Sequence, residues 1–316
     1  MTENSPAVAP ATLPSRPLRK ARRRQRASTL LATVRTPRGA IGLGMAALVV
    51  LTAIVGPLAA PYAPDAPVTL ALGHPSGQFL LGGDYLGRDV LSRVLDGGWV
   101  LLVMAVGATA LGMVGGALAG VSAAYLRGVS DGFIMRVVDV ILSFPQVVFA
   151  LLLLSLLGPK LWLITLAVGI SHAPQVARVL RSATLDISER DFVKAAELQG
   201  MRPVKIMVKE ILPNLVSPLT VEAGLRLTYS ITIIAGLAFL GFGQPPPAAN
   251  WGTMIYENRT GLALNPWAVI VPAALIALLT IGINTFTDAF ARVALGVDRR
   301  PEEAALIDDL GPGAGQ

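Results

Sequence analysis

Long apolar runs recur along the chain and alternate with shorter polar stretches. As an α-helix, a chain needs roughly 20 apolar residues to cross a hydrocarbon core of about 30 Å. Six segments meet this length, at residues 40–60, 100–125, 137–157, 161–180, 218–242 and 267–286. None shows the two-residue alternation of a membrane β-barrel, and lipid offers no water to pair with open strand edges. The pattern predicts an all-α integral membrane protein with six transmembrane helices.

The same pattern divides the chain into regions. The run at residues 40–60 is about twice as long as the core of a cleaved signal peptide, which favours a retained helix. The predicted regions are a basic disordered tail (1–39), a first transmembrane helix (40–61), an extracytoplasmic segment (62–97), a five-helix core (98–290) that contains a polar cytoplasmic loop (181–213), and a C-terminal tail (291–316).

Composition agrees with a membrane protein, and charge predicts its orientation. Hydrophobic residues make up 53% of the 316 residues and charged residues only 15%, which is too apolar for an ordinary soluble domain. Nine of the 26 Lys and Arg residues lie between Arg16 and Arg38, before the first apolar run. Basic residues concentrate in cytoplasmic loops, so we place both termini in the cytoplasm. A polybasic stretch at this position suits an anionic leaflet better than a nucleic acid.

Several classes of chemistry are excluded or disfavoured. The chain has no cysteine and only two histidines, His74 and His172, which excludes thiol chemistry and disfavours a metal centre. It contains no G-x-x-x-x-G-K-[ST] phosphate loop, so it cannot hydrolyse ATP in the P-loop manner. We expect no catalytic residue and no metal site in this chain.

Small and polar residues within the apolar runs suggest packing and a translocation path. Glycines recur every four positions in the second helix, at Gly112, Gly116 and Gly120. This spacing favours close contact with a neighbouring helix. Glu222 and Arg226 stand four residues apart on one face of the fifth helix, where they can neutralise each other. We interpret them as a structural pair, or alternatively as polar lining of a path together with Thr228 and Ser230.

The polar loop between the fourth and fifth apolar runs is predicted to form two short helices. Ser188 precedes Asp191 by three residues, as in a helix cap, and Gly200 suits a left-handed helix end. Pro203 can open a second helix, which Pro213 interrupts. A surface helix with two adjacent alanines presents a small, smooth face, so we expect it to dock on another protein.

This loop resembles the cytoplasmic "EAA" loop of binding-protein-dependent ABC importer permeases, whose pattern is E-A-A-x3-G-x9-I-x-L-P. Lys194 stands at the position of the glutamate and Glu210 at that of the isoleucine, so a salt bridge from position 194 would be reversed in sign. The resemblance implies that the loop docks on an ATPase through Phe192, Lys194, Ala195, Ala196, Gly200, Leu212 and Pro213. We expect a bulky charge at Ala196, or Gly200→Val, to uncouple transport without preventing insertion.

Other stretches are similar to the second membrane subunit of dipeptide, oligopeptide and nickel permeases. They are His74–Pro75, Gly82–Arg93, Ser143–Pro145, Ile211–Asn214, and Phe239–Pro246 with Trp251–Gly252. The resemblance covers roughly residues 40–296 and implies a type I (MetI-like) permease core. It makes Asp84, Arg88, Asp89 and Trp251 candidate contacts with a binding protein, although Arg88 and Asp89 could instead be structural.

The resemblance implies a permease subunit in the inner membrane of a prokaryote that forms half of a path for di- or oligopeptides. The implied partners are a homologous second permease, two ATPase subunits that bind ATP and Mg, an extracytoplasmic binding protein, and membrane lipid. Nickel chelates or other small solutes are the alternative cargo. An ion-driven secondary transporter is the rival mechanism, but it usually shows an internal repeat and ionisable groups at mid-membrane.

Overall fold

The computed structural model describes residues 29–244 and 247–296. The remaining parts of the two predicted tails, residues 1–28 and 297–316, and Pro245 and Pro246 lie outside the described residues. Within the described ranges the chain forms helices and turns, with two isolated β-bridges and no strand. The helices are α2 (Pro37–Ala59), α3 (Val90–Asp96), α4 (Gly98–Leu126), α5 (Gly128–Leu142), α6 (Gln146–Leu157), α7 (Leu161–Ser188), α8 (Asp191–Leu198), α9 (Pro203–Ile206), α10 (Val216–Leu237), α11 (Trp251–Asn258) and α12 (Trp267–Ala294).

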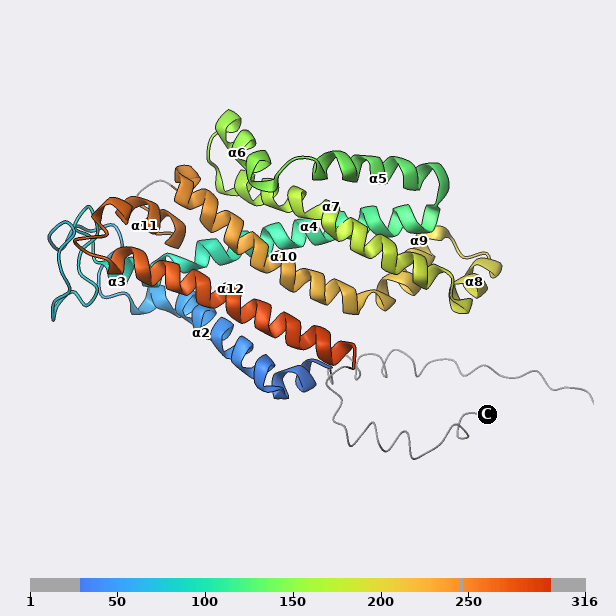
Figure 1. Cartoon of the computed structure of the whole chain (residues 1–316), viewed down its shortest axis with the longest axis horizontal. Coiled ribbons are helices and arrows are strands. Elements are labelled where there is room, and N and C mark those ends of the chain that lie inside the picture. The colour runs from blue at the N-terminus through green and yellow to red at the C-terminus, as the bar shows by residue number, and fades with distance from the viewer. Residues whose placement is uncertain (1–28, 245–246, 297–316) are drawn as a thin grey trace, which may run out of the picture.

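Five segments are long and apolar enough to cross a membrane: α2, α3 with α4, α7, α10 with the π-helical turn η3 (Ala238–Phe242), and α12. They run along the long axis of the molecule in Figure 1, with α8 and α9 at one end and α3 and α11 at the other. Helix α2 begins, and helix α12 ends, toward the end of the molecule that holds α8. We call this the inner end, following the predicted orientation.

The predicted third span is not one straight helix. The run at 137–157 is divided between α5 and α6, which are bent by 78° at Ser143–Pro145. Pro145 has no backbone N–H to donate and disfavours helical geometry at the residue before it, which explains the break. Residues 29–244 and 247–296 therefore contain five continuous helical segments that are long and apolar enough to span a membrane, or six if the bent pair crosses as one.

The spacing of glycines in α4 is explained by its contact with α7. A Cβ added at Gly116 would lie 2.5 Å from Cβ of Val176 and 2.6 Å from the carbonyl oxygen of Ala173. At Gly112 it would lie 2.7 Å from Cβ of His172. Only glycine permits this separation of the two backbones, so the predicted close packing of the second helix is confirmed.

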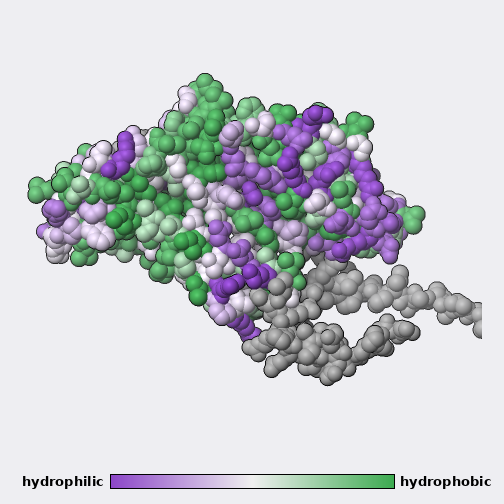
Figure 2. Space-filling model, in the orientation of Figure 1, coloured by the Kyte–Doolittle hydropathy of each residue, from purple (hydrophilic) through white to green (hydrophobic). Residues whose placement is uncertain are grey.

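Buried hydrophobic residues at the inner end form a cluster, which we call the inner-end cluster. Its buried members are Val121, Ile187, Val193, Ala196, Ile206, Ile211 and Leu215. They come from α4, α7, α8, α9, the π-helical turn η1 (Met207–Ile211) and the residue before α10. Hydrophilic residues gather over this end in Figure 2, while hydrophobic residues dominate the middle of the molecule and α6. The short helices are therefore a packed extension of the bundle rather than a loose loop.

Candidate functional site

The ends of α8 and α9 follow the sequence prediction in most respects. Gly200 has φ +73° and ends the α8 segment in the left-handed region, and Pro203 is the first residue of α9. Leu212 and Pro213, both half-buried, lie in the 3-10 turn η2 (Leu212–Asn214) where the second helix stops. The predicted cap was wrong, because α7 continues through Ser188 and the hydroxyl of this residue bonds back within α7.

The two alanines of α8 lie in different environments. Ala196 is 6% exposed and lies with Val193 in the inner-end cluster, and Phe192 packs against that cluster half-buried. Ala195 is exposed, and Leu198 is 91% exposed. Ala196 therefore attaches α8 to the rest of the chain, whereas Ala195 and Leu198 are presented to the surroundings.

Polar contacts join α8 to the connection between α4 and α5. The carboxylate of Glu189 pairs with Arg127, and its Oε2 lies 3.6 Å from Nζ of Lys194. The hydroxyl of Tyr125 donates to Oε1 of Glu197 at 2.9 Å. The Arg127 guanidinium holds the pKa of Glu189 below its usual range. The sequence gave no sign of this link, since its partners are far apart along the chain.

A buried ion network joins the outer segment to α3 and α11. Arg88 Nε lies 2.6 Å and Arg93 Nη1 3.0 Å from Oδ2 of Asp84, and Nη2 of each arginine lies 3.0 Å from Oε2 of Glu257. All four side chains are at most 6% exposed, and their charges balance. Burial raises the pKa of Glu257, and the nearby Arg88 partly offsets this rise. A balanced, hydrogen-bonded set of this kind fixes geometry, because removing one partner leaves an uncompensated buried charge.

Four polar side chains form what we call the polar ladder between α10, α7 and α6. Glu222 Oε2 accepts from Arg226 Nε at 3.1 Å, and Arg226 Nη1 donates to Oε1 of Gln175 at 3.1 Å. The same Gln175 oxygen accepts from Nε2 of Gln146 at 3.0 Å. The predicted pairing of Glu222 with Arg226 is present, and the two glutamines extend it to neighbouring helices.

A separate buried contact links α4, α7 and α10. Ser230 Oγ lies 3.0 Å from Nε2 of His172 and 3.1 Å from Oγ1 of Thr109. Ser230 is 0% and Thr228 8% exposed within this chain. Neither side chain is open to a path in this conformation, so the expected lining role is not supported for these two residues.

Comparison with known proteins identifies the family. Residues 112–294 match the family described as "Binding-protein-dependent transport system inner membrane component". The chain belongs to this family of transport permeases. The resemblance carried by the sequence is thereby confirmed.

Relatives of this permease extend over most of its length. The di/tripeptide transport system permease protein DppC of Pseudomonas aeruginosa is 34% identical over 259 residues, which cover 79% of this chain and 86% of the relative. The dipeptide transport system permease protein DppC of Alkalihalophilus pseudofirmus is 32% identical over 250 residues, which cover 78% and 82%. The two proteins thus match this permease over nearly the same share of its length.

Among solved structures, the methionine ABC transporter MetNI in an inward-facing conformation matches with a TM-score of 0.52 and 20% identity. The match covers 66% of this chain and 97% of that one. At this level of identity the likeness concerns the fold, and it agrees with the predicted type I importer core.

The expected binding-protein contacts of the permease are framework residues. Asp84, Arg88, Asp89 and Trp251 are 0%, 3%, 2% and 0% exposed. Besides the ion network, Asp89 Oδ2 caps α3 by accepting from the backbone and hydroxyl of Ser92, and Trp251 Nε1 donates to a backbone oxygen of α3 at 2.8 Å. These side chains have no surface to offer a partner, so the structure does not support direct contact and favours the structural alternative for Arg88 and Asp89.

One face of α10, continued by the turn η3, is not covered by any other part of the described chain. Tyr229 is 51% and Phe239 44% exposed, Thr232 is exposed, and a Cβ at Gly236 would meet nothing within 4 Å. Tyr229, Thr232 and Gly236 lie on α10, and Phe239 and Leu240 lie on the turn η3 that continues it. We call this set of residues the α10 stripe. Sequence analysis missed it, because the hydropathy of α10 does not distinguish which of its faces is covered.

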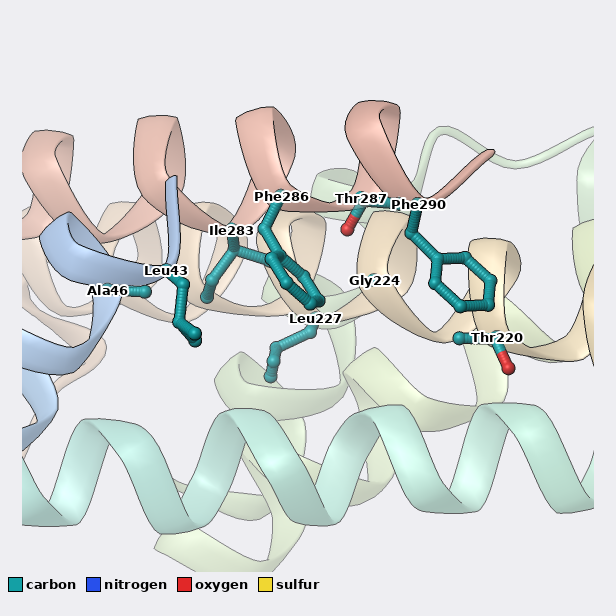
Figure 3. Close-up of a pocket in the computed structure, with 9 residues that line it drawn as sticks. All are labelled: Leu43, Ala46, Thr220, Gly224, Leu227, Ile283, Phe286, Thr287 and Phe290. Carbon is teal, nitrogen blue, oxygen red and sulfur yellow. The ribbon is translucent and has the colours of Figure 1, made fainter. Parts of the chain in front are cut away.

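The permease also has an apolar cavity between α2, α10 and α12. Its volume is about 240 Å³, and it is lined by Leu43, Ala46, Thr220, Gly224, Leu227, Ile283, Phe286, Thr287 and Phe290 (Figure 3). No charged side chain faces it, so it offers no partner for the charged ends of a peptide. Among residues 29–244 and 247–296, no group of three or more His, Asp or Glu side chains could hold a metal ion.

Proposed function

We propose that this chain is one of two homologous permease subunits of an ATP-driven importer for di- or oligopeptides. The observation that carries the proposal is the inner end, where α8 is seated on its own apolar cluster and presents Ala195 and Leu198 outward. A rigidly mounted helix with a small exposed face can receive and transmit force from a partner. The peptide cargo is supported by the relatives, which are named as di/tripeptide and dipeptide transport permeases.

The energy enters through two ATPase subunits that hold ATP and Mg, and this chain contributes no catalytic group. Their closure displaces α8, and the contacts Glu189–Arg127 and Glu197–Tyr125 pass the movement to the connection of α4 with α5. Arg127 has φ 53°, an uncommon conformation for a side-chain-bearing residue, and the following Gly128 has φ 60°. A connection of this kind lets α5 change direction relative to α4.

An extracytoplasmic binding protein delivers the peptide to the outer end. The buried ion network holds the outer segment on α3 and α11, and exposed apolar side chains beside it offer the contact surface. Leu80, Leu86 and Trp99 are 64%, 50% and 48% exposed. We propose these three, rather than the buried network, as the surface that receives the binding protein.

The path runs along the α10 stripe and is completed by the second permease. Tyr229 is half-exposed, and its hydroxyl suits a hydrated path, since an unpaired polar group in lipid costs free energy. The exposed side of α2, in contrast, carries Ile41, Leu48, Leu51 and Ile54, as expected for contact with lipid. The importer lies in the inner membrane of a prokaryote with both termini of this chain in the cytoplasm.

The proposal is tested by purifying the tagged chain in mild detergent, identifying copurifying proteins by mass spectrometry, and measuring their ATPase activity. We expect a homologous permease and one or two P-loop ATPases, with vanadate-sensitive hydrolysis. Reconstituted with a binding protein, the complex should take up dipeptides only with ATP, and a nickel chelate serves as the alternative cargo. A single chain that transports without ATP would instead indicate an ion-driven transporter.

A further inference from the structure

The polar ladder lies at the inner end of the α10 stripe. Gly224, between the two charged residues of the ladder, packs so tightly on α12 that a Cβ there would lie 2.1 Å from Oγ1 of Thr287. The next residue of α12, Asp288, is exposed, and Arg292 follows in its last turn. These charges mark the inner boundary of the apolar span, so a solute that follows the stripe inward reaches the ladder before it leaves the membrane.

The ladder does not use all of its hydrogen-bond donors. Arg226 donates from Nε to Glu222 and from Nη1 to Gln175. Gln175 takes part in these contacts only through its oxygen, which accepts. No described residue accepts from Arg226 Nη2 or from Gln175 Nε2, and neither nitrogen is sealed inside the protein. A guanidinium has five N–H groups and an amide has two, so Arg226 and Gln175, which are hydrogen-bonded to each other, both retain donors without a partner in the described chain.

The unused donors have a chemical preference. Hydrogen bonds from a guanidinium to a carboxylate are charge-assisted and stronger than those between neutral groups. Glu222 neutralises Arg226 through Nε and Gln175 accepts from Nη1, so a carboxylate would be bound by Arg226 Nη2 together with the amide nitrogen of Gln175. Tyr229, half-exposed, has its ring centroid 5.2 Å from Cζ of Arg226 and provides an aromatic wall on the side of the stripe.

We propose that Arg226 and Gln175 form a subsite that receives the C-terminal carboxylate of the transported peptide at the cytoplasmic end of the path. This inference rests on the proposed peptide cargo. The carboxylate is common to peptides of any sequence, so the subsite accepts many cargoes. Because Glu222 already balances the arginine, a second anion is held weakly enough to leave.

The test uses the whole importer in proteoliposomes, with its second permease, ATPases and binding protein. ATP-driven uptake is measured for a dipeptide and for the same dipeptide with a C-terminal amide, each at a concentration that saturates the binding protein. The key variant is E222Q/R226Q, which removes both charges without leaving either one unpaired. The variant D139N/R178Q removes an exposed ion pair between α5 and α7 and serves as a matched control.

We expect the wild type and D139N/R178Q to transport the free acid faster than the amide. E222Q/R226Q should take up the free acid about 10-fold more slowly and lose the preference, an effect equivalent to about 1.4 kcal/mol. If the double variant keeps the preference, or if uptake of both peptides falls equally, the subsite is refuted and the ladder is structural. ATP-driven uptake by the wild type in the same assay supports the proposed function whichever result the variants give.

Discussion

At the residue scale, two adjacent alanines of α8 differ in their exposure. Ala195 and Ala196 are separated by about 100° around α8, which is enough to place one outside and the other in the inner-end cluster. The expectation that a charge at Ala196 would uncouple transport without harming insertion treated both alanines as one docking face. In the structure Ala195 and Leu198 are exposed and are therefore the residues of α8 that the proposed docking face can use, whereas Ala196 is part of the packing.

This difference predicts opposite outcomes for two adjacent substitutions. Ala195→Glu should change stability by no more than about 0.5 kcal/mol, as for an ordinary surface site, but reduce ATP-driven uptake by about 10-fold or more. Ala196→Glu should lower stability by several kcal/mol, because it buries a charge without a partner. The measurements are thermal unfolding of the purified chain in detergent and uptake in proteoliposomes. Normal uptake by Ala195→Glu would remove this face from the coupling contact.

At the element scale, two features of the helices arise from what each residue lacks. The missing N–H of Pro145 divides the third apolar run into α5 and α6. The missing side chains of Gly112, Gly116 and Gly120 let α4 approach α7. Hydropathy recognises neither effect, because it measures only how apolar a segment is. The residue before proline and the glycine spacing are the signals that identify them.

The packing of α4 on α7 predicts different results for two neighbouring glycines. Gly116→Ala should cost about 1–3 kcal/mol, since the added Cβ meets Val176 and a backbone oxygen at 2.5 and 2.6 Å. Gly115→Ala is the matched control, because its Cβ would lie 3.5 Å from Cβ of Ala173, an ordinary contact. It should be neutral or stabilise the helix by up to about 1 kcal/mol. Apparent unfolding temperatures in detergent compare the two, and equal values would contradict the close approach.

At the scale of the whole molecule, the two ends are held together by different interactions. The inner end combines the exposed face of α8 with links to the connection of α4 and α5, and the outer end is held by a buried ion network. The α10 stripe and the polar ladder lie between them. The proposed function requires that the two ends lie on opposite sides of the membrane.

Cysteine labelling tests that requirement without background, because the chain has no cysteine. Leu80→Cys and Val129→Cys replace side chains that are 64% and 91% exposed at opposite ends, and Val129 lies outside the proposed docking face. In spheroplasts, a membrane-impermeant maleimide should label position 80, and it should label position 129 only after the membrane is opened. The wild type should remain unlabelled. Labelling of both positions in sealed spheroplasts would overturn the predicted orientation.

The sequence by itself determined the membrane class, the number of apolar runs, the short helices ended by Gly200 and opened by Pro203, and the family. These features depend on local chemistry, because the length of an apolar run, the backbone preference of a residue and the spacing of a motif can be recognised in the sequence alone. Tertiary structure decided which side chains are covered. It buried Asp84 and Trp251, which the sequence had offered to a partner. Burial depends on residues distant in the chain, as Glu257 beside Arg88 and Gln175 beside Arg226 illustrate, and no local pattern contains those distances.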